Sequence, residues 1–148
     1  MSLESPRRHP PLAIAAIVLE TVLALGAIGG GIALILGPRG EIVGLPVSAL
    51  AGSPFDSYLV PGVILFVVLG LGSLVGAVLA WRAHPVAPLL TIAIGGALLI
   101  WLVVQISVIG FSTDPPLQPI YLGMGLVIAA IGAAWSLDAA RHGQLRAR

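Results

Sequence analysis

The fold is decided by an apolar stretch at residues 12–36, which reads LAIAAIVLETVLALGAIGGGIALIL. Its one charged side chain is Glu20. An α-helix needs about 20 apolar residues to cross a hydrocarbon core of about 30 Å. The stretch is long enough for that, and it is about twice as long as the apolar region of a secretory signal. It therefore predicts a retained transmembrane helix.

Three further apolar stretches follow, at residues 59–81, 86–111 and 120–137, and none contains a charged residue. Hydrophobic residues make up 58% of the 148-residue chain and charged residues 9%, against about 45–50% and 25% in soluble domains. A soluble core of this size cannot hide so much apolar surface. We therefore predict an all-α protein, a transmembrane four-helix bundle that forms one integral membrane domain over residues 1–148.

Positive charge is distributed unevenly along the chain. Six of the seven arginines fall on one side of the membrane if the chain crosses four times: Arg7, Arg8, Arg82, Arg141, Arg146 and Arg148. Because arginine-rich loops stay in the cytoplasm, we expect cytoplasmic tails at residues 1–10 and 138–148. The absence of lysine is typical of a G- and C-rich genome, which indicates a bacterial inner (cell) membrane. Five aromatic residues near span ends are expected in the headgroup layer: Tyr58, Trp81, Phe111, Tyr121 and Trp135.

The loop between spans one and two is long and contains many apolar residues; residues 39–59 read RGEIVGLPVSALAGSPFDSYL. Pro46 suits the first turn of a short helix, and a Gly-Ser-Pro sequence ends it. We expect this helix to lie on the outer surface or to fold over the mouth of the bundle and close a cavity. Asp56 either caps the start of span two or joins Glu41 in binding a ligand or cation.

Glu20 lies about nine residues into span one, or about 13 Å from its inner end at 1.5 Å per residue. A charged carboxylate is costly there, so we expect Glu20 to be protonated, paired or facing a wet cavity. One interpretation is a functional proton-binding group, which is the default for an ionisable side chain inside a membrane. The other is a structural carboxyl group that donates to a backbone carbonyl or to Ser73.

Other polar groups are predicted near the outer side. Gln105 in span three either bonds a neighbouring helix or contacts a ligand, and Trp101, one turn before it, shares its helix face. Four loop and span-end residues would complete a polar outer mouth: Glu41, Asp56, Asp114 and Gln118.

Glycines at helical spacing indicate close packing between helices. The pairs Gly26/Gly30 and Gly72/Gly76 fit the Gly-x-x-x-Gly pattern, which lets helix backbones approach each other. The pairs serve either packing within one chain or an interface with a second copy or another membrane protein. Membrane lipids are the other expected partners.

Several kinds of chemistry are excluded by composition. The chain has no cysteine, which removes disulfides and thiolate metal sites. Its three histidines, His9, His84 and His142, all lie outside the predicted spans, so no metal or haem site is expected. A net charge of +1 does not favour nucleic-acid capture, and no catalytic or phosphate-binding motif is present. We therefore predict no catalytic residues, no metal and no cofactor.

Three segments carry a resemblance to a known family: SPFDSYLVPG at 53–62, WLVVQ at 101–105 and LQP at 117–119. The chain resembles uncharacterised bacterial four-span membrane proteins over most of its length, which implies the fold but no activity. In addition, AIVLE at 16–20 is similar to the first helix of small multidrug-resistance transporters, in which a lone Glu binds proton and cation. That similarity covers one helix.

Two functional hypotheses follow from the sequence. The first is a non-enzymatic membrane protein, either an accessory subunit or a protein that contacts lipid or a small hydrophobic ligand. The second is a proton-coupled small transporter or channel-like homo-oligomer in which Glu20 is the switch.

Overall fold

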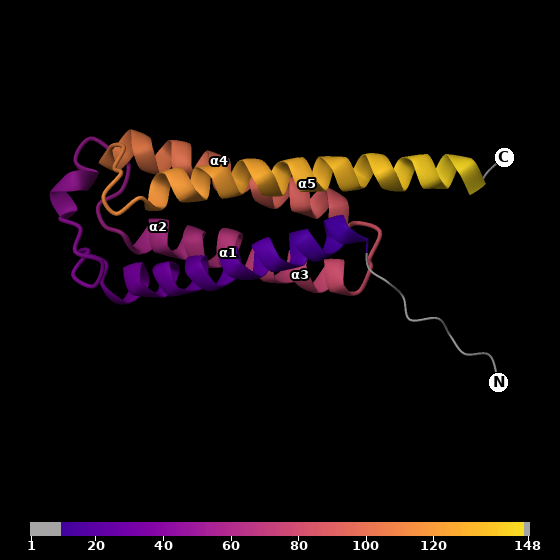
Figure 1. The fold of residues 1–148 in the computed structure, drawn as a ribbon. Coiled ribbons are helices and arrows are strands. Elements are labelled where there is room, and N and C mark those ends of the chain that lie inside the picture. The colour runs from indigo at the N-terminus through magenta and orange to yellow at the C-terminus, as the bar shows by residue number, and fades with distance from the viewer. Residues whose placement is uncertain (1–9, 147–148) are drawn as a thin grey trace.

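The computed structural model describes residues 10–146, and in this part of the chain helices joined by loops are the only regular secondary structure, with no β-strand (Figure 1). The predicted all-α four-helix bundle is confirmed. Its long helices are α1 (Pro11–Leu36), a second crossing built from α2 (Leu59–Ile64), the π-helical segment η2 (Leu65–Leu71) and α3 (Gly72–Trp81), then α4 (Ala87–Ile109) and α5 (Leu117–Arg146).

Four helical stretches are long and apolar enough to cross a membrane, with mean hydropathy between 1.9 and 2.7: Pro11–Leu36, Leu59–Trp81, Ala87–Ile109 and Leu117–Arg141. Large apolar side chains cover their outward faces, for example Leu25 and Ile100, each more than two-thirds exposed. Lipid is the solvent in which such a surface is stable. The fold therefore fits a multi-pass membrane protein.

The bundle consists of two tight helical hairpins, α1 with the second crossing and α4 with α5. Glycines form both contacts. A methyl group placed on Gly31 would lie 2.8 Å from the backbone nitrogen of Phe66, and one placed on Gly95 would lie 2.5 Å from that of Ala129. The backbones therefore approach as closely as glycine allows, which is how helices associate where lipid competes for apolar contact.

Three of the four glycines in the Gly-x-x-x-Gly pairs also have neighbours within the chain. Gly26 faces the Tyr121 hydroxyl and Gly30 faces Leu65. Gly76 faces Ile94 and the Glu20 carboxyl, whereas Gly72 has only its own helix within 4 Å. Gly26, Gly30 and Gly76 thus take part in packing within the chain.

The two ends of the bundle are packed differently. We call the end that carries residues 37–58 and 110–116 the loop end, and the opposite one the terminal end, since α1 begins and α5 ends there (Figure 1). At the terminal end, four fully buried alanines from α1, α3 and α4 pack with Trp135 of α5: Ala13, Ala16, Ala80 and Ala87. Small side chains let the hairpins meet there. Towards the loop end, α4 makes little contact with η2, and the hairpins leave space between them.

The fourth helix is longer than predicted. The sequence indicated a span at 120–137, but α5 begins at Leu117 and continues to Arg146. Pro119 lies in the first helical turn, where proline is tolerated because the N–H it lacks has no helical partner. The helix continues past the apolar run, so much of the predicted tail at 138–148 is helical. Six of the sequence-predicted charges and histidines fall outside the described residues or side chains: Arg7, Arg8, His9, His142, Arg146 and Arg148.

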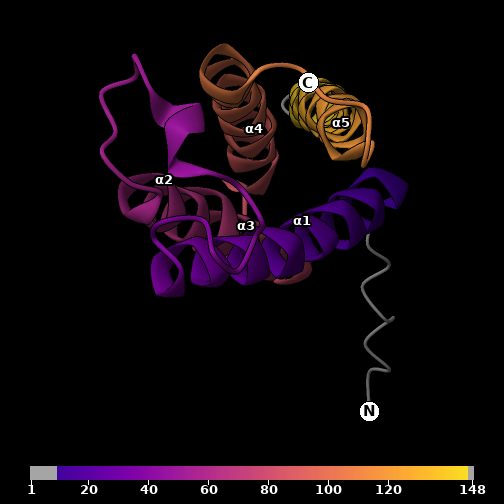
Figure 2. The same ribbon diagram turned by 90° about the vertical axis from the view of Figure 1, so that its left-hand side faces the viewer.

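Residues 37–58 fold back over the loop end, close to α2 and α4 (Figure 2). Their short helix is one 3₁₀ turn, η1 (Val47–Leu50), with Pro46 immediately before it. Tyr58 holds the loop down: its N–H donates to the Pro38 carbonyl at 2.8 Å and its hydroxyl donates to the Pro46 carbonyl at 3.0 Å. We call this segment the roof.

The predicted Asp56 cap is wrong. Tyr58 is the residue that precedes α2, and no side chain caps that helix. Asp56 is exposed and lies two residues too early for its carboxylate to reach the first turn. The nearer Ser57 hydroxyl accepts the Leu59 N–H instead, at 3.4 Å.

Candidate functional site: an apolar cavity beneath the roof

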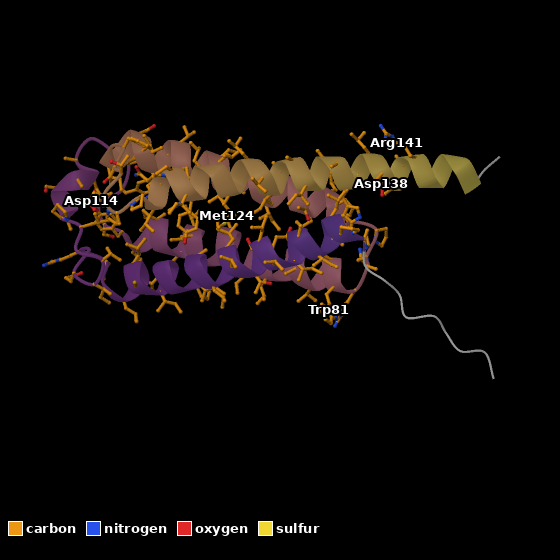
Figure 3. The ribbon with its side chains drawn as sticks, in the orientation of Figure 1. Trp81, Asp114, Met124, Asp138 and Arg141 are labelled. Carbon is orange, nitrogen blue, oxygen red and sulfur yellow. The ribbon has the colours of Figure 1, made fainter. Side chains whose placement is uncertain are left out.

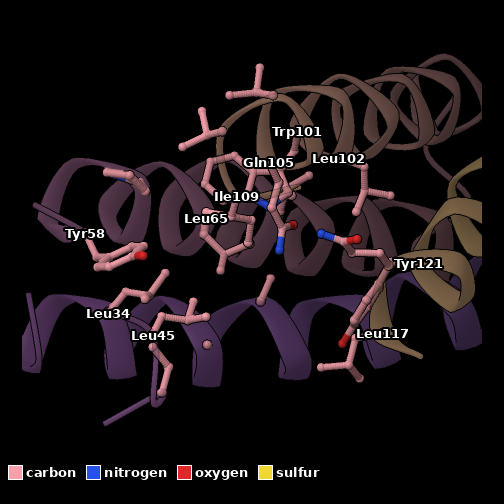
Figure 4. Close-up of a pocket in the computed structure, with 18 of the residues that line it drawn as sticks. Leu34, Leu45, Tyr58, Leu65, Trp101, Leu102, Gln105, Ile109, Leu117 and Tyr121 are labelled. Carbon is pink, nitrogen blue, oxygen red and sulfur yellow. The ribbon is translucent and has the colours of Figure 1, made fainter. Parts of the chain in front are cut away.

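A cavity of about 310 Å³ lies between the hairpins at the loop end (Figure 4). This volume is at the small end of the range for ligand pockets, about 300–1,000 Å³. The lining residues farthest from the roof are Leu23, Leu69 and Leu98, which form the floor. The roof contributes apolar residues, among them Leu50 and Phe55. The cavity is thus bounded by apolar side chains both above and below.

The sequence of α1 explains why there is space here. Gly26, Ala27 and Gly30 face the cavity from α1, and none of them has a side chain larger than a methyl group. Beside them, Leu65 and Leu69 project from η2, a π-helical segment of the kind often found at functional sites. Small residues on α1 and a widened helix next to it leave room towards α4 and α5, whose side chains complete the lining.

Two of the polar residues that line the cavity, Gln118 and Tyr58, already make side-chain hydrogen bonds within the protein. The Gln118 amide donates to the Gly110 carbonyl at 3.0 Å and accepts from the Ser112 N–H at 2.6 Å. It therefore ties the end of α4 to the start of α5. Tyr58 already donates to the roof, and burial raises the pKa of its phenol above the ordinary value, so the hydroxyl stays protonated and keeps its hydrogen bond.

The other three polar residues make no hydrogen bond with their side chains within residues 10–146: Trp101, Gln105 and Tyr121. Trp101 and Gln105 are one turn apart on α4 and line the same wall. The Gln105 amide does not bond a neighbouring helix; it points into the space between the helices (Figure 4). These groups are available to a bound molecule.

Glu20 lies outside this cavity, one turn below the floor residue Leu23. It is fully buried against Gly76 of α3 and near Ile94 of α4. Neither carboxyl oxygen has a hydrogen-bond partner among the described residues, nor does the buried Ser73 hydroxyl, so the predicted bond between them is absent. The buried Thr91 lies beside the carboxyl, but its hydroxyl donates to the Ala87 carbonyl at 3.0 Å.

The predicted polar outer mouth is not formed. Glu41, Asp56 and Asp114 are exposed and do not line the cavity. The Glu41 carboxylate accepts the Arg39 N–H at 2.9 Å. Asp114 lies at the loop end, opposite to Asp138 and Arg141 (Figure 3). Leu45, Leu50 and Phe55 of the roof line the cavity, whereas Glu41 and Asp56 of the same loop are exposed. Among the described residues no group of three or more side chains could hold a metal ion.

Sequence reasoning missed two polar side chains that lie between the helices, the half-buried Tyr121 and the buried Thr91. Tyr121 was expected in the headgroup layer, yet it is half-buried and its hydroxyl faces Gly26. Tyr58 and Trp135 are likewise buried, while Trp81 and Phe111 are exposed. An aromatic residue near a span end has the same sequence signature whether it meets headgroups or packs inwards.

Comparison of the chain with protein-family models, with curated proteins and with solved structures finds no match. The fold and the site define the class to which the chain can be assigned: a four-helix, multi-pass membrane protein with an apolar cavity under a folded loop.

Proposed function

We propose that this chain is a non-enzymatic membrane protein that binds a lipid or another small hydrophobic molecule in the cavity beneath the roof, alone or as an accessory subunit. The cavity is the observation that carries the proposal. Its lining is apolar apart from a few polar side chains, which is the composition of small-molecule sites generally. Each methylene group of a ligand that leaves water there contributes about 0.8 kcal/mol.

Filling the cavity is expected to abolish binding. Ala27 is buried and lines the cavity, so Ala27→Phe would occupy much of its volume. The protein in lipid nanodiscs is titrated with a bromoalkane, which quenches tryptophan fluorescence on contact. Binding in the cavity is measured as the quenching of Trp101, which is the part of the total quenching that is lost in Trp101→Phe. We expect binding at least about tenfold weaker in Ala27→Phe, a loss of about 1.4 kcal/mol.

The matched control is Leu25→Phe, because Leu25 is 69% exposed on the outward face of the same helix. It should bind the bromoalkane like the natural chain. Equal quenching of Trp101 in Ala27→Phe and in the natural chain would contradict the proposal, provided that circular dichroism shows both to be folded.

We also propose that the terminal end faces the cytoplasm of a bacterial cell, which follows from the arginine bias. The start of α1, the connection between α3 and α4, and the C-terminal part of α5 share this end (Figure 1). Because the chain has no cysteine, single-cysteine variants report directly. An impermeant maleimide should label Ser48→Cys in intact cells, and Ala139→Cys only after lysis; the reverse pattern would invert the topology.

A second candidate function, proton-coupled transport by the chain or a channel-like homo-oligomer, is favoured by one observation. The Glu20 carboxyl is fully buried and has no hydrogen-bond partner among the described residues, and such groups in membranes are functional by default. This candidate predicts pH-dependent ligand binding that Glu20→Gln abolishes, so retained binding in Glu20→Gln would contradict it.

The cavity proposal makes the opposite prediction for Glu20→Gln. The amide has nearly the shape of the protonated carboxyl and adds no charge, so folding and bromoalkane binding should be unchanged between acidic and alkaline pH. Binding measured at both pH values in the natural chain and in Glu20→Gln separates the two functions.

A further inference from the structure

The three uncommitted polar side chains of the cavity offer mainly hydrogen-bond donors. A glutamine amide has two N–H donors, an indole one and a phenol one. Trp101, Gln105 and Tyr121 make no side-chain hydrogen bond within residues 10–146. A donor that a bound molecule covers without accepting from it is costly in an apolar site, and orphaned N–H groups are rarer in proteins than under-satisfied oxygens. The only acceptor atoms on these three side chains are the Gln105 and Tyr121 oxygens, so their four donor hydrogens are in excess.

The cavity also lacks charge. None of its lining residues is acidic, basic or a histidine. Glu20 is the nearest buried acid on α1, and it lies beneath the floor rather than in the lining. A charged ligand would lose its hydration with no opposite charge to meet it, which is strongly unfavourable. The lining thus selects neutral molecules.

The depth of the donors in the cavity indicates where along the ligand its acceptor atom must lie. Gln105 lies one turn nearer the roof than Trp101 and well above the floor residue Leu98 on the same helix. Apolar residues lie both above and below it, at Leu50 and Leu23. A ligand therefore needs its oxygen at mid-depth with apolar parts on either side.

We infer that the occupant is a neutral molecule from the bilayer that carries a carbonyl oxygen within an apolar chain, such as an acyl ester, and that the Gln105 amide donates to that oxygen. The inference rests on the proposed function, since it names the ligand class of the same cavity. A route from the bilayer is available: the lining residue Val104 is 40% exposed on α4, within a stretch long enough to span the membrane.

The test compares three brominated probes of equal chain length in nanodiscs: a fatty-acid methyl ester, the alkane, and the free carboxylate at alkaline pH. Binding is measured as the quenching that Trp101→Phe removes, with Ala27→Phe as the baseline for quenching from bulk lipid. We expect the ester to bind about tenfold more tightly than the alkane, the effect of one hydrogen bond in an apolar site. The carboxylate should not exceed the baseline.

Gln105→Leu should remove the preference of the ester over the alkane. The matched control is Ser107→Ala, because the Ser107 hydroxyl is exposed and donates within its own helix to Val103 at 2.7 Å; it should keep the preference. Equal affinity for ester and alkane in the natural chain, or an unchanged preference in Gln105→Leu, would overturn the inference and leave the proposed function standing. Failure of all three probes to exceed the baseline would instead remove the proposed function.

Discussion

Replacing Gly95 by alanine is expected to push α4 away from α5 and to destabilise the bundle strongly. The added methyl group would lie 2.5 Å from the Ala129 backbone nitrogen and 2.9 Å from its Cα. Backbone atoms cannot rotate away as a side-chain end can, so the helices must separate. Overpacking of this kind costs about 1–3 kcal/mol, which thermal unfolding in detergent, followed by circular dichroism, would measure.

The neighbouring glycine is an internal control. A methyl group on Gly96 would have nothing within 4 Å, and alanine is the better helix former by about 1 kcal/mol. Gly96→Ala should therefore be neutral or slightly stabilising. If the two variants unfold at the same temperature, the close contact between α4 and α5 does not exist, and the wall of the cavity is not where the structure places it.

Replacing Tyr58 by alanine is expected to release the roof. The Tyr58 ring is buried against Leu34 and Leu50, and removing such a ring from a core costs about 3–5 kcal/mol. The hydrogen bond to Pro46 is lost as well. Tyr58→Phe keeps the ring and loses only that bond, about 1 kcal/mol, so it should loosen the roof far less.

Cysteine labelling measures this release. Leu50 is 4% exposed, whereas its neighbour Ala51 is exposed. With a water-soluble maleimide, Leu50→Cys should react much more slowly than Ala51→Cys, and Tyr58→Ala should speed only the former, at least about tenfold. Equal rates for Leu50→Cys and Ala51→Cys with Tyr58 in place would show that the loop floats free in water.

Most of the helix positions could be predicted because lipid imposes one rule, a long apolar run for each crossing. Residues 59–81 were predicted as the second span, and the structure has the same limits. The helix limits were predicted less well where the end of a helix does not coincide with the end of the apolar run. Once α5 leaves the apolar run near residue 137, hydropathy carries no information about where the helix ends. Gly110 ends α4 two residues before the predicted limit, with a φ of +83° that favours glycine.

The site could be predicted only in part. The one-turn spacing of Trp101 and Gln105 placed them on one face, and they line the same cavity. Tyr121 could not be found, because its role depends on facing Gly26 across two helices that are distant in the sequence. The loop acids were placed in the mouth because polar residues were expected there; the direction in which the roof packs is a tertiary property that local sequence does not reveal.

The occupancy of the cavity is tested most directly by photolabelling in native membranes with a diazirine-bearing acyl ester, followed by mass spectrometry of the labelled peptides. If the cavity binds such molecules, adducts form on cavity residues such as Leu65 and Gln105, and they are lost in Ala27→Phe but not in Leu25→Phe. Adducts confined to lipid-facing residues such as Val18 and Ile100, unchanged by Ala27→Phe, would contradict it.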